Sequence, residues 1–295
     1  MKDATGLSLL DLVILSACED EDALPLAPFR KTARILQRVH TNTSIGPAVA
    51  HEPLLDLCRP WVVHLPLIEG QGNIGSPDDP PANPRYTESR LTPLGVAALN
   101  VERDQLGPLP IALINGTMLS GGPHPPHDPG RVVAAIRAAI DDASDAELVE
   151  LVGPPAFPTG CVVDVDQEAL AAGATVELRQ RAQFVHLGDQ LMVTGLPLRT
   201  GPDVIADRLH GRLRTAAHDA GVNGLDQPNL TDLIVELRPG TDPSAAIAVL
   251  SGIWDLNRTD HVRLREPMAD AIRRIADGGR DLDHRLALID DAIRP

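Results

Sequence analysis

The stretch "PLIEGQGNIGSPDDPPANPRYTESRL", residues 66 to 91, decides how the first third of this chain folds. It contains the chain's only tyrosine, Tyr86, placed directly after Arg85. Segment 76–84 has four prolines in nine residues, which excludes regular structure and predicts a loop. We expect this loop to present Arg85 and Tyr86 at the surface and a helix to resume over 87–106. The alternative is a tyrosine that only packs its ring against the protein.

The acidic composition limits the partners of the chain. Its formal net charge is −15, which argues against broad, non-specific binding of nucleic acid. A local basic patch is expected instead at 29–40, where Arg30, Arg34 and Arg38 fall four residues apart. On a helix this spacing makes one basic stripe, and the alternative is a solvated helix face.

The sequence gives little support for disulfides, a metal site or a membrane span. Three widely separated cysteines, Cys18, Cys58 and Cys161, form neither a disulfide framework nor a metal knuckle, so a reduced cytoplasm is expected. The acidic "DVDQE" (164–168) fits a strand end better than a metal site. No apolar run reaches the length of about 18 residues that a membrane span needs.

Helical and β-like patterns divide the chain into three expected domains, 1–106, 107–260 and 261–295. Short helices joined by tight turns in the first are typical of a helix-turn-helix or winged-helix module. The second interleaves β-like segments with helices at about 202–219 and 243–256, and the third predicts a short helical hairpin. The fold class is therefore predicted to be α+β.

Six motifs then follow one another in a recognisable order, namely "APFRKTARILQRV", "PLIEGQGNIGS", "RYTESRL", "LINGT", "PPHDPGRVVAAI" and "GPPAFPTG". In this order they resemble the A subunit of type IIA DNA topoisomerases, DNA gyrase and topoisomerase IV, over about residues 6 to 260. The resemblance implies a winged-helix DNA-gate domain, then an α/β tower-like domain, then a reduced coiled-coil region. It also implies a homodimer that binds duplex DNA in the cytoplasm.

Tyr86 is the catalytic residue that the resemblance implies. In this family the tyrosine of the R-Y-T-E motif attacks a DNA phosphodiester and becomes linked to the 5′ phosphate. A phenol with a pKa of about 10 must lose its proton as it attacks, and the adjacent cation of Arg85 can stabilise the charge that develops. Because a phosphotyrosine is itself a phosphodiester, resealing needs no ATP.

The resemblance also implies a set of DNA-binding residues. Lys31 and Arg34 are expected to contact phosphates, and the turn with Gln71 and Asn73 is expected to support the active site through glycines that allow φ > 0. Met118 or Leu119 is expected to insert between base pairs, with simple packing as the alternative. The complete set is Lys31, Arg34, Arg38, Gln71, Asn73, Arg90, Met118 and Leu119.

Some of the family's functional groups are absent from this sequence. Leu12 and Val13 stand where the family has a basic pair, and "TSIG" (43–46) replaces its H-P-H-G signature. Removing one group that stabilises transition-state charge typically costs roughly 10²- to 10³-fold in rate. No cofactor is expected to bind this chain itself, since Mg²⁺ and ATP belong to the family's B subunit, which is the expected partner. His124 and His127 match a proline-rich turn of the family and are expected to be structural.

Three functions remain open at this point. The leading hypothesis is reversible DNA cleavage through Tyr86 by a type II topoisomerase-like enzyme, with a B-type ATPase partner. The competing hypothesis is a non-catalytic DNA-binding or regulatory paralogue that interacts with gyrase subunits. In a third, the acidic surface prevents DNA binding and only the interaction with another subunit survives.

Overall fold

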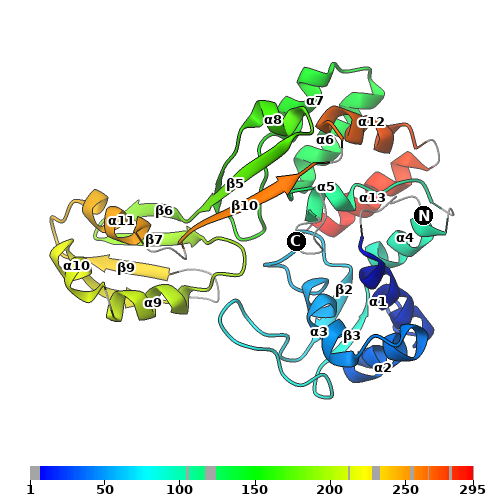
Figure 1. The fold of residues 1–295 in the computed structure, drawn as a ribbon, viewed down its shortest axis with the longest axis horizontal. Coiled ribbons are helices and arrows are strands. Elements are labelled where there is room, and N and C mark those ends of the chain that lie inside the picture. The colour runs from blue at the N-terminus through cyan, green and yellow to red at the C-terminus, as the bar shows by residue number, and fades with distance from the viewer. Residues whose placement is uncertain are drawn as a thin grey trace.

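The structure is a computed structural model that describes residues 7–103, 106–116, 124–211, 213–227, 233–252, 256–264, 266–278 and 281–294. Within these residues helices are mixed with three antiparallel sheets, so the predicted α+β class is confirmed. Two large hydrophobic cores, which we call the first core and the second core, are joined by a long β ribbon (Figure 1).

The N-terminal helices build the side of the first core that carries Tyr86. Helix α1 (Leu9–Asp20) begins where it does because Ser8 and Asp11 form a reciprocal capping box, with Asp11 N donating to Ser8 Oγ over 3.1 Å. Helices α2 (Thr32–Thr43) and α3 (Pro47–Asp56) follow, and both pack against α1. The left-handed residue Ser44 ends α2.

A small sheet lies beside these helices, and it corrects one prediction. Strands β1 (Arg30–Lys31), β3 (Glu88–Leu91) and β2 (Ile68–Gln71) pair antiparallel in that order. Segment 87–106 was expected to be helical throughout, but helix α4 (Pro93–Glu102) begins only after β3. Thr87, Ser89 and Leu91 are buried at alternate positions, a period of two that suits a strand paired on both sides.

The basic stripe expected over 29–40 is also corrected. Arg30 lies in β1, paired with Ser89, and α2 starts only at Thr32. Arg34 and Arg38 therefore share a helix, whereas Arg30 does not belong to it. The four-residue spacing holds over the helical part alone, because strand pairing with β3 overrides helix formation at 30–31.

The first core extends well beyond the N-terminal helices. Helices α5 (Ile111–Asn115), α6 (Pro129–Ile140) and α7 (Asp145–Val152) contribute buried residues to the same cluster. So do α12 (Met268–Ala276) and α13 (Leu282–Ile293), the two helices expected as a hairpin, which both pack against α6. The boundaries 1–106, 107–260 and 261–295 stay predictions. The first core draws buried residues from all three of these segments.

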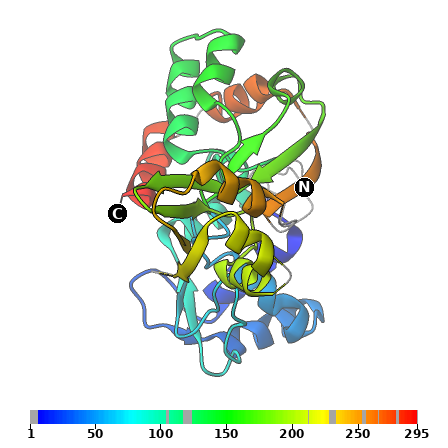
Figure 2. The ribbon, with the colours of Figure 1, turned by 90° about the vertical axis from the view of Figure 1, so that its left-hand side faces the viewer.

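The β ribbon leads to the second core. Strand β5 (Thr175–Arg181) pairs with β10 (Asn257–Arg263) and β4 (Val162–Asp164), and α8 (Gln167–Ala171) joins β4 to β5. Beyond it, strands β6 (Gln183–Leu187), β7 (Gln190–Gly195), β9 (Leu233–Leu237) and β8 (Val222–Asp226) form a sheet in that order. Helices α9 (Pro202–His210), α10 (Arg214–Asp219) and α11 (Pro243–Ser251) complete this unit (Figure 2).

No helix within the described ranges combines the length and the apolar character that crossing a bilayer requires.

Candidate active site around Tyr86

Tyr86 has an exposed ring on a fixed backbone. Its side chain is 68% exposed, whereas the next residue, Thr87, is fully buried. The Tyr86 amide donates to Asn83 O over 2.8 Å, and Thr87 Oγ1 donates to Thr32 Oγ1 over 2.9 Å. Thr32 Oγ1 in turn lies 2.9 Å from Ser89 Oγ. The phenol is thus free to meet a ligand while its main chain is held.

The first turn of α2 holds both flanks of the tyrosine. Thr32 N donates to Thr87 O over 3.0 Å, and Ala33 N donates to Pro84 O over 3.1 Å. Amides at a helix start have no partner within the helix, so they are available for such contacts. The residues on either side of Tyr86 therefore lie at the positive end of the α2 dipole, where an anion is favoured.

The glycine-rich turn after β2 lies close to the main chain of Tyr86. Gly72 has φ +95°, and a Cβ there would lie 3.2 Å from Tyr86 O. Asn73 O accepts from Ala82 N over 3.0 Å, and Asn73 Oδ1 accepts from Gly75 N over 2.8 Å. The predicted φ > 0 glycines are confirmed, and the side chains of Gln71 and Asn73 are exposed next to this turn.

Arg85 precedes Tyr86 directly and lies close to its ring. Its guanidinium carbon lies 5.9 Å from the centre of the Tyr86 ring, and its Nε donates to Asn83 Oδ1 over 3.2 Å. Within the part of the chain that the structure describes, Arg85 forms no ion pair with a carboxylate. Its charge is therefore available to a phosphate.

The other basic residues expected to contact DNA each have a carboxylate partner in the chain. Lys31 Nζ lies 2.9 Å from Glu88 Oε1, and Arg90 Nη2 lies 2.7 Å from Glu69 Oε2. The Arg90 guanidinium also stacks 4.2 Å from the centre of the Phe29 ring. Arg34 and Arg38 both pair with one carboxylate, that of Glu21. The sequence signalled the basic residues but not these partners.

The two residues expected to insert between base pairs, Met118 and Leu119, lie outside the described residues.

The segment that leads into the proline-rich loop is held by a buried arginine and the ion pairs around it. Arg59, only 5% exposed, donates from Nε to Ile74 O over 3.0 Å and pairs with Glu52 over 2.6 Å. Arg199, just before α9, pairs with Asp56 of α3 over 2.8 Å. Burial raises the pKa of Asp56 above its ordinary value, against the opposing effect of Arg199. Arg59 carried no sequence signal, because nothing near residue 59 points to residue 74.

A second contact joins the same loop to α9. Asp78 Oδ2 accepts from Asp203 N over 3.2 Å, at the start of the helix. The carboxylate sits over Gly201, where an added Cβ would lie 2.0 Å from Asp78 Oδ1. Burial raises the pKa of Asp78, while the bond from the Asp203 amide opposes that rise. The loop is thus attached to both α3 and the second unit.

Three histidines, His64, His124 and His127, lie close enough to one another to interact. His127 is fully buried and His124 is 7% exposed, while His64 Nε2 lies 2.8 Å from Ala156 O. Burial, with a smaller effect of His124, lowers the pKa of His127 to about 3. Burial also lowers the pKa of His64. In the described ranges no three His, Cys, Asp or Glu side chains are grouped as a metal site.

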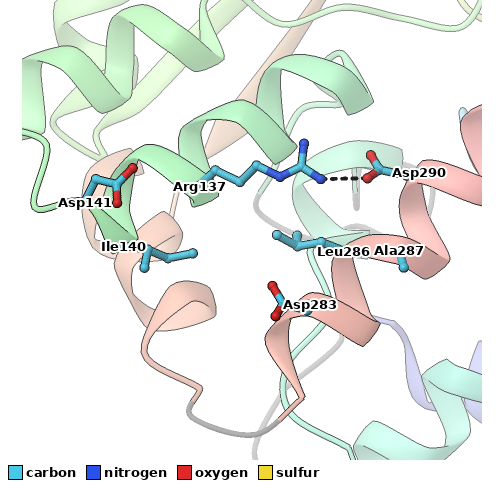
Figure 3. Close-up of a pocket in the computed structure, with 7 residues that line it drawn as sticks. All are labelled: Arg137, Ile140, Asp141, Asp283, Leu286, Ala287 and Asp290. Atoms are coloured by element: carbon cyan, nitrogen blue, oxygen red, sulfur yellow. Dashed lines mark hydrogen bonds and ion pairs between the residues drawn. The ribbon is translucent and has the colours of Figure 1, made fainter.

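The hollow between α6 and α13 lies beside the first core, and its net charge is negative, which does not suit DNA. It encloses about 430 Å³, and Arg137 crosses it to bind Asp290 over 2.7 Å (Figure 3). Asp141 and Asp283 leave it with a surplus of negative charge. A phosphate would therefore be repelled there, whereas Arg85 faces solvent beside Tyr86.

Comparison with known proteins identifies the relatives of this chain. Residues 14–106 match the family model of the A subunit of DNA gyrase and topoisomerase IV. The A subunit of DNA gyrase from Synechocystis is 30% identical in an alignment 245 residues long that covers 69% of this chain and 28% of that protein. The A subunit of DNA topoisomerase 4 from the same organism is 28% identical in an alignment 291 residues long that covers 83% of this chain and 31% of that protein.

A plant organelle protein gives the same result. The chloroplastic/mitochondrial DNA gyrase A subunit of Arabidopsis thaliana is 28% identical in an alignment 283 residues long that covers 82% of this chain and 30% of that protein. The chain belongs to the family of type IIA topoisomerase A subunits, which includes those of gyrase and topoisomerase IV. It spans less than a third of the length of these relatives.

Proposed function

We propose that this protein binds duplex DNA and reversibly cleaves a strand through Tyr86, in the manner of the A subunit of a type II topoisomerase. The observation that carries the proposal is the exposed phenol on a main chain fixed from both sides by α2. Holding a nucleophile in one geometry lowers the entropic part of the barrier. Helices α2 and α3 with the sheet β1-β3-β2 support the winged-helix interpretation, and the second unit supports the tower-like one.

The proposed reaction is a transesterification. Tyr86 Oη bonds to the phosphorus, and the bond from phosphorus to the 3′ oxygen of the neighbouring nucleotide breaks. The phenolic proton passes to solvent, and the 3′ oxygen leaves as a hydroxyl after taking up a proton. Arg85 stabilises the negative charge that gathers on the phosphoryl oxygens, as a fixed cation in place before the attack. Reversal restores the strand with no net energy input.

Partners complete the proposed function. We propose a homodimer that works with a B-type subunit, and we expect Mg²⁺ and ATP to come with that partner. Mg²⁺ would supply further neutralisation of phosphate charge. The residues of this chain would orient the tyrosine and hold the DNA backbone.

The test is covalent capture. Plasmid is incubated with the protein, Mg²⁺ and candidate B subunits, then denatured, and DNA-linked protein is measured. We expect Tyr86→Phe to abolish capture, because Phe keeps the exposed ring but has no nucleophile, and to leave thermal stability unchanged. Since Tyr86 is the only tyrosine of this chain, any phosphotyrosine recovered from the chain belongs to it. Arg85→Lys is the matched control for charge, and Arg85→Gln should lower capture by roughly 10²-fold or more.

A second function is favoured by the ion pairs within the chain. Lys31, Arg34, Arg38 and Arg90 are matched by internal carboxylates, and the chain carries a net charge of −15. This arrangement suits a weak DNA binder or a regulator of another topoisomerase subunit. Full biological activity in a Tyr86→Phe variant would favour this function over cleavage.

A further inference from the structure

Glu21 is a buried carboxylate at the centre of the basic residues. It follows the last residue of α1, and its side chain is only 4% exposed. Oε1 accepts from Arg38 Nε over 2.7 Å, and Oε2 accepts from Arg34 Nε. The main-chain oxygen of the same residue accepts from Arg30 Nε over 2.9 Å. One residue therefore binds the three arginines that the sequence placed in one basic stripe.

The Glu21 carboxylate stays ionised in this setting. Burial alone would raise its pKa, but the hydrogen bonds from Arg38 and Arg34 outweigh that effect and hold the pKa below its ordinary value. A buried carboxylate with both oxygens bound to guanidinium groups is costly to separate from them, since either charge left alone would be poorly solvated. A DNA phosphate therefore cannot readily displace Glu21.

Arg34 and Arg38 nonetheless face outward. Their side chains are 67% and 38% exposed, and Arg34 meets Glu21 through Nε alone, which leaves its terminal nitrogens toward solvent. A phosphate that binds these nitrogens meets two positive charges with one negative charge fixed directly behind them. Arg34, Arg38 and Glu21 together thus carry one net positive charge, whereas the sequence of α2 alone shows two.

We propose that Glu21 is an internal counter-charge that limits how tightly Arg34 and Arg38 hold a phosphate of duplex DNA. This inference rests on the proposed DNA binding and deepens it, because it names the residue that sets the affinity. The buried carboxylate keeps the two side chains in place and lowers their attraction for the DNA backbone. Binding is consequently weak and readily reversed, as suits a protein that releases and reseals DNA.

The experiment measures DNA affinity across a KCl series. Fluorescence anisotropy of a labelled duplex longer than two helical turns is recorded for the full chain and for Glu21→Gln. The glutamine keeps the size and one acceptor oxygen but removes the charge. We expect affinity to rise about three- to ten-fold at low salt. The slope of log affinity against log salt should become steeper by the amount that about one additional phosphate contact gives.

Glu19→Gln is the matched control. It removes the same charge two residues earlier, from a carboxylate that pairs with Arg103 and not with α2. We expect it to change affinity by less than about two-fold, the effect of net charge alone under screening. Adding Arg34→Gln to Glu21→Gln should abolish the gain. Glu21→Met, with an apolar side chain of similar length, is a second variant in which we expect the gain, so that a folding defect in one variant does not decide the result.

The outcomes separate the two proposals. Equal or weaker binding of both Glu21 variants relative to Glu19→Gln overturns the counter-charge, while DNA binding by the wild type stands. An absence of salt-dependent binding in the wild type and in every variant overturns the DNA contact itself, and the counter-charge with it. A gain in both Glu21 variants that disappears with Arg34→Gln supports the inference.

Discussion

The first core and the second core bury different kinds of side chain. The first core region encloses buried polar or charged residues beside its aliphatic cluster, among them Glu21, Arg59, Asn115 and His127. Within the described part of 182–256, the second core buries no polar or charged side chain. A buried polar group is costly unless paired, so its presence marks places where position matters more than stability.

The location of these groups strengthens that comparison. Arg59 reaches the loop before Tyr86, and Glu21 binds the arginines of α2. Asn115 uses both side-chain atoms on Leu65, each over 2.8 Å. The polar groups of the first unit thus hold particular loops and side chains, while the second unit is stabilised mainly by apolar burial. We infer that substitutions in the two units act on different properties.

The largest effect expected from this comparison is on the stability of the second core. Leu191→Ala removes a fully buried side chain of β7 and should lower the free energy of unfolding by about 2–5 kcal/mol. Chemical denaturation measures this loss. Under conditions where the variant stays folded, covalent capture through Tyr86 should persist. A variant that is folded but loses capture would contradict the division of roles.

Lowering the pH should destabilise the first core before the second core. The folded-state pKa values of His127 and His64 are lowered by burial, so both stay neutral in the folded chain while the unfolded chain takes up protons below its pKa of about 6.5. Stability is therefore complete above that pH and is lost as pH falls from there toward the folded value of about 3 for His127. The expected loss is at most about 1.4 kcal/mol per pH unit for each histidine.

Denaturation at a series of pH values checks this, with hydrogen exchange to localise the opening. His127→Gln should reduce the slope by about one proton. His218→Gln, at an exposed histidine of α10, is the matched substitution control. Acid-induced opening that begins in the second core instead would show that the buried histidines do not govern this behaviour.

The smallest effect concerns the ion pair between Arg199 and Asp56 of α3. Arg199 is 40% exposed at its side chain, so Arg199→Gln should cost only about 1 kcal/mol or less in stability. Residues 72–84 should nevertheless exchange their amide hydrogens faster, because Asp56 loses the nearer of its two arginine partners and the other, Arg59, binds Ile74 O. Arg181→Gln is the control, since Arg181 pairs with Asp164 inside the ribbon. Equal amide hydrogen exchange rates in the two variants would show that Arg199 does not stabilise the loop.

Local chemistry made part of the site predictable. Four prolines in nine residues imply a loop, and Gly72 and Gly75 imply φ > 0, because both depend on residues only a few positions apart. The α+β class followed from apolar periodicity in the same way. Strand β3 was missed because the segment's helical pattern is equally local, while pairing with β1 and β2 is not. That pairing brings residues 30–31 and 68–71 beside 88–91.

The sequence by itself determined that this chain presents a single tyrosine beside an arginine at the end of a stiff loop, and it determined the family. Only the tertiary structure decided how charge is distributed around that tyrosine. Glu21 lies thirteen and seventeen residues from Arg34 and Arg38, and Arg199 lies more than a hundred residues from Asp56. Ion pairs depend on distance in space and on burial, and neither can be read from a spacing along the chain.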